Sequence, residues 1–321
     1  MGQTGKLFCK PTSVPGSLPP PRKTNLKIAY FGLPLGALLL TFDGHAPALV
    51  VLAPVDAPGR RRLLAGSTPV LDASEAGPGF EQQVSDALAA LQPDLLVSWF
   101  WTRKLPQSWL AQPRLGAIGV HPSLLPRHRG PNPYFGSIDA GDEETGVTLH
   151  RLEAEYDTGN ILATRRIPVA GRDSWQLARA LDRPSLVVLR EGVAGFASGK
   201  PPAEVVQDER QATWAPEPSG DQLRVDFGWS TERVLRRIRA LSPTPGLGLE
   251  VEGVELFVTR AEPASDFIAA LLPGEAHISD ALSLRTGDGA VRITRAYFPT
   301  TEADAEGAED VAEELRLAIS P

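Results

Sequence analysis

The chain has 321 residues, which is long for one ordinary domain and predicts two. Hydrophobic residues make up 42% of it, and no run approaches the roughly 18 apolar residues that a membrane span needs. The net charge of −7 is uneven, because residues 208–321 carry 21 acidic side chains against 11 arginines. We therefore expect a two-domain globular protein without a membrane partner, whose acidic second half disfavours a nucleic-acid interface.

The N-terminal stretch 1–25 is basic and rich in proline, and it contains no continuous apolar segment. It lacks the features of a secretory signal, so we expect a disordered, solvated tail. A myristoylation motif at Gly2 would need Ser or Thr where Lys6 stands. The single cysteine, Cys9, excludes an internal disulfide and a cysteine metal cluster. We expect a cytoplasmic protein that needs no metal.

Three short apolar runs in the first half are typical of buried parallel strands: 26–32, 48–53 and 95–100. Between the second and third, residues 80–91 carry apolar side chains at helical spacing. Strands that alternate with helices predict an α/β, Rossmann-like domain with a parallel-type sheet. The full G-x-G-x-x-G fingerprint is absent after the first strand, which disfavours NAD binding.

A long helix is predicted over residues 174–197, with Asp173 or the following serine as its N-cap and an interruption at Pro184. Trp99 and Trp101 lie two residues apart at the end of a predicted strand. Strand alternation therefore predicts that both lie on one face, where paired tryptophans are usually core and one could line a pocket.

Proline and glycine clusters at 199–202 and 216–220 indicate a linker. After it, residues 231–241 have helical spacing, with Ser230 or Thr231 as the cap. Several short strands following one helix indicate a small β-barrel. The predicted strands cover 248–258, 281–286 and 290–296.

The most informative segment combines several motifs between residues 115 and 162. His121-Pro-Ser-Leu-Leu-Pro126 and Arg129-Gly130 come first, Thr145-Gly-Val-Thr-Leu-His150 lies in the middle, and Asp157-Thr-Gly-Asn-Ile-Leu162 follows. Together they resemble the catalytic core of the folate-dependent formyltransferases. That family includes methionyl-tRNA formyltransferases, amino-sugar formyltransferases and glycinamide ribonucleotide transformylases. Short matches from Ala212-Thr-Trp-Ala-Pro216 onward resemble methionyl-tRNA formyltransferase, so the resemblance covers nearly everything after residue 25.

The resemblance implies a Rossmann-like formyltransferase domain over residues 26–205 and an OB-like β-barrel domain over 206–321. It also implies that a formyl group passes from 10-formyltetrahydrofolate to a primary amine. By the family pattern, His121 and Asp157 are catalytic. An imidazole suits the proton and oxyanion roles because it titrates near neutral pH, and a nearby carboxylate favours and orients the imidazolium.

The family motif has Asn two residues before the histidine, whereas this chain has Gly119. An amide there would donate to the developing oxyanion, and removing one such donor typically costs about 10²–10³ in rate. The sequence therefore leaves open a slow enzyme, a donor supplied elsewhere, or a changed reaction such as hydrolysis. The candidate substitute donors are Ser98, Thr102, His128 and Asn132.

The resemblance places the folate at Ser123, Leu124, Leu125 and Pro126. A proline-fixed loop with apolar side chains suits a flat pterin ring, whose edge can bond to backbone groups. Arg129 belongs to the same signature. It is expected either to bind a carboxylate or phosphate of the substrate or to support the loop.

The acceptor amine stays open between two classes. Methionyl-tRNA is favoured by the two-domain layout, and four arginines of the predicted helix 231–241 could form a basic stripe. A small amine, such as an amino sugar or a secondary metabolite, is favoured by the acidic second domain and by the short loop 54–69. A catalytically impaired homologue that only binds folate is the third hypothesis.

Overall fold

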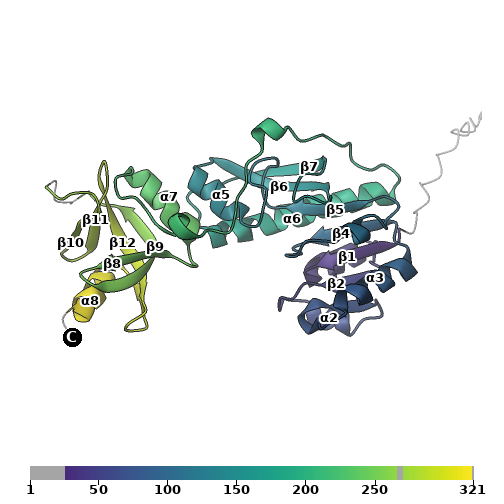
Figure 1. The fold of residues 1–321 in the computed structure, drawn as a ribbon, viewed down its shortest axis with the longest axis horizontal. Helices are drawn as coiled ribbons and strands as arrows, with labels where there is room; N and C mark the ends of the chain where they lie inside the picture. The colour runs from purple at the N-terminus through teal and green to yellow at the C-terminus, as the bar shows by residue number, and fades with distance from the viewer. Residues whose placement is uncertain (1–25, 266–269, 320–321) are drawn as a thin grey trace, which may run out of the picture.

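A computed structural model describes residues 26–265 and 270–319. The predicted tail and Cys9 lie outside the described residues. Figure 1 shows a mixed α/β domain at one end of the molecule and a curled antiparallel sheet at the other, with helix α7 between them. This arrangement confirms the predicted fold class of a Rossmann-like domain followed by a barrel-like domain.

The first domain contains a seven-stranded sheet with the order β3-β2-β1-β4-β5-β6-β7. Neighbouring strands are parallel from β3 to β5, and β6 and β7 are added antiparallel. The elements are β1 (Ile28–Gly32), α1 (Pro34–Phe42), β2 (Leu49–Leu52), α2 (Arg60–Leu64), β3 (Val70–Asp72), α3 (Phe80–Leu91), β4 (Leu95–Trp99), α4 (Gln107–Leu110), β5 (Ala117–His121), α5 (Pro133–Ala140), β6 (Glu144–Arg151), β7 (Ile161–Pro168) and α6 (Ser174–Ala197).

The sheet is buried on both faces, which explains why its central strands are continuously apolar. Helices α1, α5 and α6 cover one face, and α3 and α4 cover the other. Strand order reverses between β1 and β4, and in such sheets ligands bind beyond the carboxyl ends of the strands at this reversal. Gly32 is required here, because a Cβ at this position would lie 1.7 Å from the Trp99 carbonyl oxygen.

Helix α6 starts as predicted, since Asp173 and Gln176 form a reciprocal capping box. The predicted interruption is wrong, because the helix continues through Pro184. A proline removes one backbone hydrogen bond, whereas α6 buries apolar side chains along most of its length against the sheet. That burial holds the helix together across the proline.

The second domain is an antiparallel sheet with the order β10-β11-β12-β9-β8, and β13 pairs with β12. The predicted strand 248–258 is in fact a hairpin, because Glu252 and Gly253 both have positive φ and reverse the chain. Helix α8 was not predicted, and it packs against β12. The elements are α7 (Thr231–Leu241), β8 (Leu247–Val251), β9 (Val254–Pro263), β10 (Ala276–Ile278), β11 (Leu282–Arg285), β12 (Ala290–Phe298), β13 (Ala303–Glu306) and α8 (Ala308–Ile319).

Arg237 of α7 connects the two domains. Its Nε and Nη2 donate to the Asp139 carboxylate of α5 at 2.6 and 3.0 Å, and its Nη1 donates to backbone carbonyls of residues 221, 222 and 224. The side chain is buried beneath the rings of Phe135 and Trp229. One cation therefore joins helix α5, helix α7 and the linker.

Candidate active site

A cavity of about 540 Å³ lies beyond the carboxyl ends of β4 and β5, next to the reversal of strand order between β1 and β4. Its volume is in the range of pockets for small organic ligands. The walls are rich in aromatic and aliphatic side chains, and polar groups gather at the end of β5. Among the residues that line the cavity are Ser98, Trp99, Phe100, Trp101, Gly119, His121, Tyr134, His150, Leu152, Tyr156, Asp157 and Trp214.

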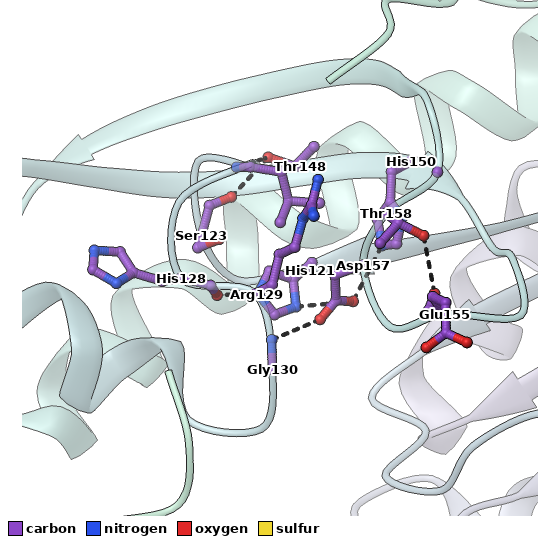
Figure 2. Close-up of polar contacts among 12 residues, drawn as sticks. His121, Ser123, His128, Arg129, Gly130, Thr148, His150, Glu155, Asp157 and Thr158 are labelled. Carbon is purple, nitrogen blue, oxygen red and sulfur yellow. Dashed lines mark hydrogen bonds and ion pairs between the residues drawn. The ribbon is translucent and has the colours of Figure 1, made fainter. Parts of the chain in front are cut away.

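Asp157 and His121, which the family resemblance indicated as catalytic, lie together at this cavity (Figure 2). His121 Nδ1 is 3.4 Å from Asp157 Oδ1, and the backbone N–H of Gly130 donates to Asp157 Oδ2 at 2.8 Å. His121 Nε2 is 2.7 Å from the carbonyl oxygen of His128. The carbonyl and the carboxylate are both hydrogen-bond acceptors. Both nitrogens of His121 are thus engaged in holding the site together.

His150 is a second imidazole beside the same carboxylate. Its Nδ1–H donates to the carbonyl of Arg151 at 2.7 Å, and its Nε2 is 3.7 Å from Asp157 Oδ1. Burial lowers the pKa of His150 to about 4, with Asp157 opposing the shift and His121 adding to it. His150 is therefore neutral at physiological pH, and its Nε2 carries a lone pair.

Gly119 lies between Ser98 and His150 in the sheet. It pairs with Ser98 of β4 on one side and with His150 of β6 on the other. Directly paired residues point to the same face, so the position of the expected amide is next to the His150 ring. A Cβ built at Gly119 would lie 2.7 Å from Leu152 Cδ2. Leu152 therefore occupies the space into which an asparagine side chain would project.

The four candidate donors are placed differently. Ser98 and Thr102 line the cavity, and Ser98 lies beside Gly119. His128 points to Asp142, with its Nε2 2.7 Å from that carboxylate. Asn132 caps helix α5 by accepting from the N–H of Phe135. Of these four, only the two hydroxyl side chains reach the cavity.

The loop 123–126 is held from β6 rather than exposed to the cavity. Thr148 accepts from the N–H of Leu125 at 3.1 Å and donates to the carbonyl of Ser123 at 2.7 Å (Figure 2). Ser123 and Leu125 are buried, and none of Ser123, Leu124, Leu125 and Pro126 lines the cavity. In this structure the side chains that were expected to contact folate are therefore not brought to the cavity.

Arg129 and Gln207 connect the linker to the loop that carries Asp157, and the sequence did not indicate Gln207. The buried Arg129 guanidinium donates to Gln207 Oε1 at 2.7 Å and forms an ion pair with Glu209. Gln207 Nε2 then donates to the carbonyls of Asp157 and Gly159, each at 2.7 Å. This geometry supports the loop-supporting role of Arg129 and fixes the Asp157 backbone, whose φ is +58°.

The lowered pKa of His150 predicts a pH-dependent stability. The folded pKa of about 4 lies below the ordinary 6.5, so the unfolded chain takes up the proton first. Stability from this residue is complete above pH 6.5 and is lost as the pH falls toward 4. Denaturant unfolding across this range should show a shallower decline for His150→Gln than for the unchanged protein. His277→Gln, on strand β10, should keep the original slope.

Within residues 26–265 and 270–319, no cluster of three or more His, Cys, Asp or Glu side chains could hold a metal ion. In the same part of the chain, no helix is long and apolar enough to cross a membrane.

Comparison with known proteins assigns the chain to a family. Residues 42–183 match the family model of formyl transferase, and residues 219–305 match that of the formyl transferase C-terminal domain. The methionyl-tRNA formyltransferase of Rhizorhabdus wittichii is 36% identical over 281 residues, which cover 84% of this chain and 90% of that protein. The methionyl-tRNA formyltransferase of Ralstonia nicotianae is 30% identical over 299 residues, which cover 86% and 91%. The chain therefore belongs to the formyl transferase family.

The fold is also found in solved structures. The N-formyltransferase of Helicobacter canadensis, crystallised with folinic acid and dTDP-3-aminofucose, superposes with a TM-score of 0.65 at 15% identity. The match covers 85% of this chain and all of that one. The likeness confirms the fold.

Proposed function

We propose that this protein transfers the formyl group of 10-formyltetrahydrofolate to a primary amine. The observation that carries the proposal is the His121–Asp157 pair, 3.4 Å apart at the polar end of a cavity with aromatic walls. A flat pterin ring fits such walls, because heteroaromatic rings stack on aromatic side chains. A folate bound in this way would place the formyl group on its N10 near the pair, where His121 stabilises the growing negative charge.

The acceptor that we propose first is methionyl-tRNA. Relatives that carry this name match the chain along about nine tenths of their own length, including the second domain. A small amine, such as an amino sugar, is the second candidate. The small amine is favoured because Arg237 forms an ion pair with Asp139. This arginine therefore does not contribute to the basic stripe that was predicted on α7 for binding RNA. Arg236 of the same stripe forms an ion pair with Glu232.

One assay separates these functions. The protein is incubated with 10-formyltetrahydrofolate and either methionyl-tRNA, an amino-sugar nucleotide or no acceptor, and tetrahydrofolate release is followed together with the formylated product. Release coupled to one acceptor identifies the substrate. Release without acceptor indicates a hydrolase. Quenching of tryptophan fluorescence, with Trp99 and Trp101 in the cavity wall, reports folate binding in the absence of turnover and would indicate a binding homologue.

The surroundings of Gly119 predict how kcat for formyl transfer responds when an asparagine is placed at this position. Gly119→Asn alone should give no gain, since its Cβ would lie 2.7 Å from Leu152 Cδ2 and the leucine must turn into the cavity. The double variant Gly119→Asn/Leu152→Ala gives the amide room, and we expect kcat about 10-fold above that of Leu152→Ala. The backbone tolerates the change, because Gly119 does not have a positive φ. A double variant no faster than Leu152→Ala would mean that no oxyanion donor is missing.

A further inference from the structure

The two imidazoles beside Asp157 differ in what their nitrogens contact. His121 directs one nitrogen to the His128 carbonyl and the other to Asp157. His150 directs only Nδ1 to a carbonyl, and its Nε2 makes no hydrogen bond to any residue that the structure describes. Nε2 of His150 is therefore a bare acceptor in the wall of the cavity.

Nε2 of His150 and Oδ1 of Asp157 form a pair of acceptors 3.7 Å apart. Neither can donate to the other while His150 is neutral, so the pair is unfavourable without a donor between them. A nitrogen atom that lies about 2.9 Å from both acceptors can donate one N–H to each of them. A group with two N–H or O–H bonds fits this gap, and the primary amine of the proposed acceptor is such a group.

The surroundings leave Nε2 of His150 without a hydrogen bond among the described residues. Gly119 is the cross-strand partner of His150 and has no side chain to bond Nε2. Leu152 covers Gly119 with methyl groups, which leaves an apolar wall on that side. The other charged groups that act on His150 are Asp157, His121 and Arg129, and Arg129 is already bonded to Glu209.

We propose that His150 is a catalytic residue that binds the acceptor amine together with Asp157 and removes its proton. The inference rests on the proposed function and names the base for that reaction.

The amine lone pair forms the new C–N bond, and the π electrons of the formyl carbonyl move to its oxygen. One proton of the now cationic nitrogen passes to Nε2 of His150, and Asp157 stabilises the resulting imidazolium at 3.7 Å. The carbonyl then re-forms, and the electron pair of the bond to N10 leaves with the folate. His150 returns its proton to N10, and the products are the formamide and tetrahydrofolate.

The test uses the full chain carrying His150→Ala. General-base catalysis typically contributes 10²–10⁴-fold, so we expect kcat to fall about 100-fold while the Kd for folate stays within about twofold. Free imidazole should restore part of the rate, more strongly as the pH rises and neutral imidazole accumulates. His277→Ala, a histidine of the second domain, is the matched control and should keep the original kcat. An unchanged kcat in His150→Ala overturns the proposal, and so does a fall that imidazole does not rescue.

A second measurement does not depend on turnover. In protein labelled with ¹⁵N-histidine, addition of methylamine should shift the Nε2 resonance of His150 and leave that of His277 in place. Absence of such a shift overturns the amine site. If the unchanged protein formylates no acceptor, the proposed function fails, and this titration still decides whether His150 and Asp157 bind an amine.

Discussion

Asp157→Asn is expected to lower kcat for formyl transfer about 1,000-fold. The carboxylate faces His121 at 3.4 Å and His150 at 3.7 Å, while its second oxygen accepts from the N–H of Gly130. An amide of the same size keeps the contact with Gly130 but removes the charge that holds both imidazoles in their roles. Single-turnover kinetics with saturating folate should therefore show a slower chemical step with little change in folate affinity.

The control for this variant is Asp304→Asn. Asp304 is also ion-paired, to Arg295, but it lies in the second domain on strand β13. Its replacement should leave kcat within about twofold. An Asp157→Asn protein that retains more than about a tenth of the original kcat would contradict the assigned role of the carboxylate.

Arg237→Ala is expected to lower the free energy of unfolding by about 3 kcal/mol, because it leaves the partly buried carboxylate of Asp139 without its partner. Asp139 would lose its ion pair, and three linker carbonyls would lose their donor. Urea unfolding at neutral pH measures the change. A double-mutant cycle with Asp139→Ala isolates the energy of the pair itself.

Arg233→Ala is the matched comparison, since this arginine of the same helix is exposed and stacks on Trp229. It should cost less than about 1 kcal/mol. If Arg237→Ala were no more destabilising than Arg233→Ala, the contact between the domains would not depend on this ion pair.

Much of the fold could be predicted from apolar periodicity. Residues 80–91 form helix α3 with the predicted bounds, and the three apolar runs of the first half are central strands of the sheet. The prediction was wrong where backbone geometry departs from the regular pattern. Trp99 and Trp101 lie on opposite faces, because Phe100 between them has a φ of +54° and breaks the strand alternation.

The candidate site was predicted only in part. His121 and Asp157 could be paired from their motifs, because both flank turns that converge in the family. The role of His150 depends on its register opposite Gly119, and no periodicity fixes which residues of β5 and β6 face each other. Gln207 gave no signal, because a glutamine in a linker is ordinary until its amide is seen bonded to the Asp157 carbonyl.

The contact of Gln207 with the Asp157 loop has a consequence for how the chain can be divided. A shortened protein is usually designed to end where a linker begins. A fragment that ends at Val205 would appear to contain the whole predicted formyltransferase domain. The missing piece would include the amide that holds the carbonyls of Asp157 and Gly159, and also Ala215, which accepts from the N–H of Asn132 and donates to the carbonyl of Arg129. The contacts that hold the Asp157 loop therefore extend past Val205 to Ala215, and a fragment that keeps this loop intact must end after Ala215.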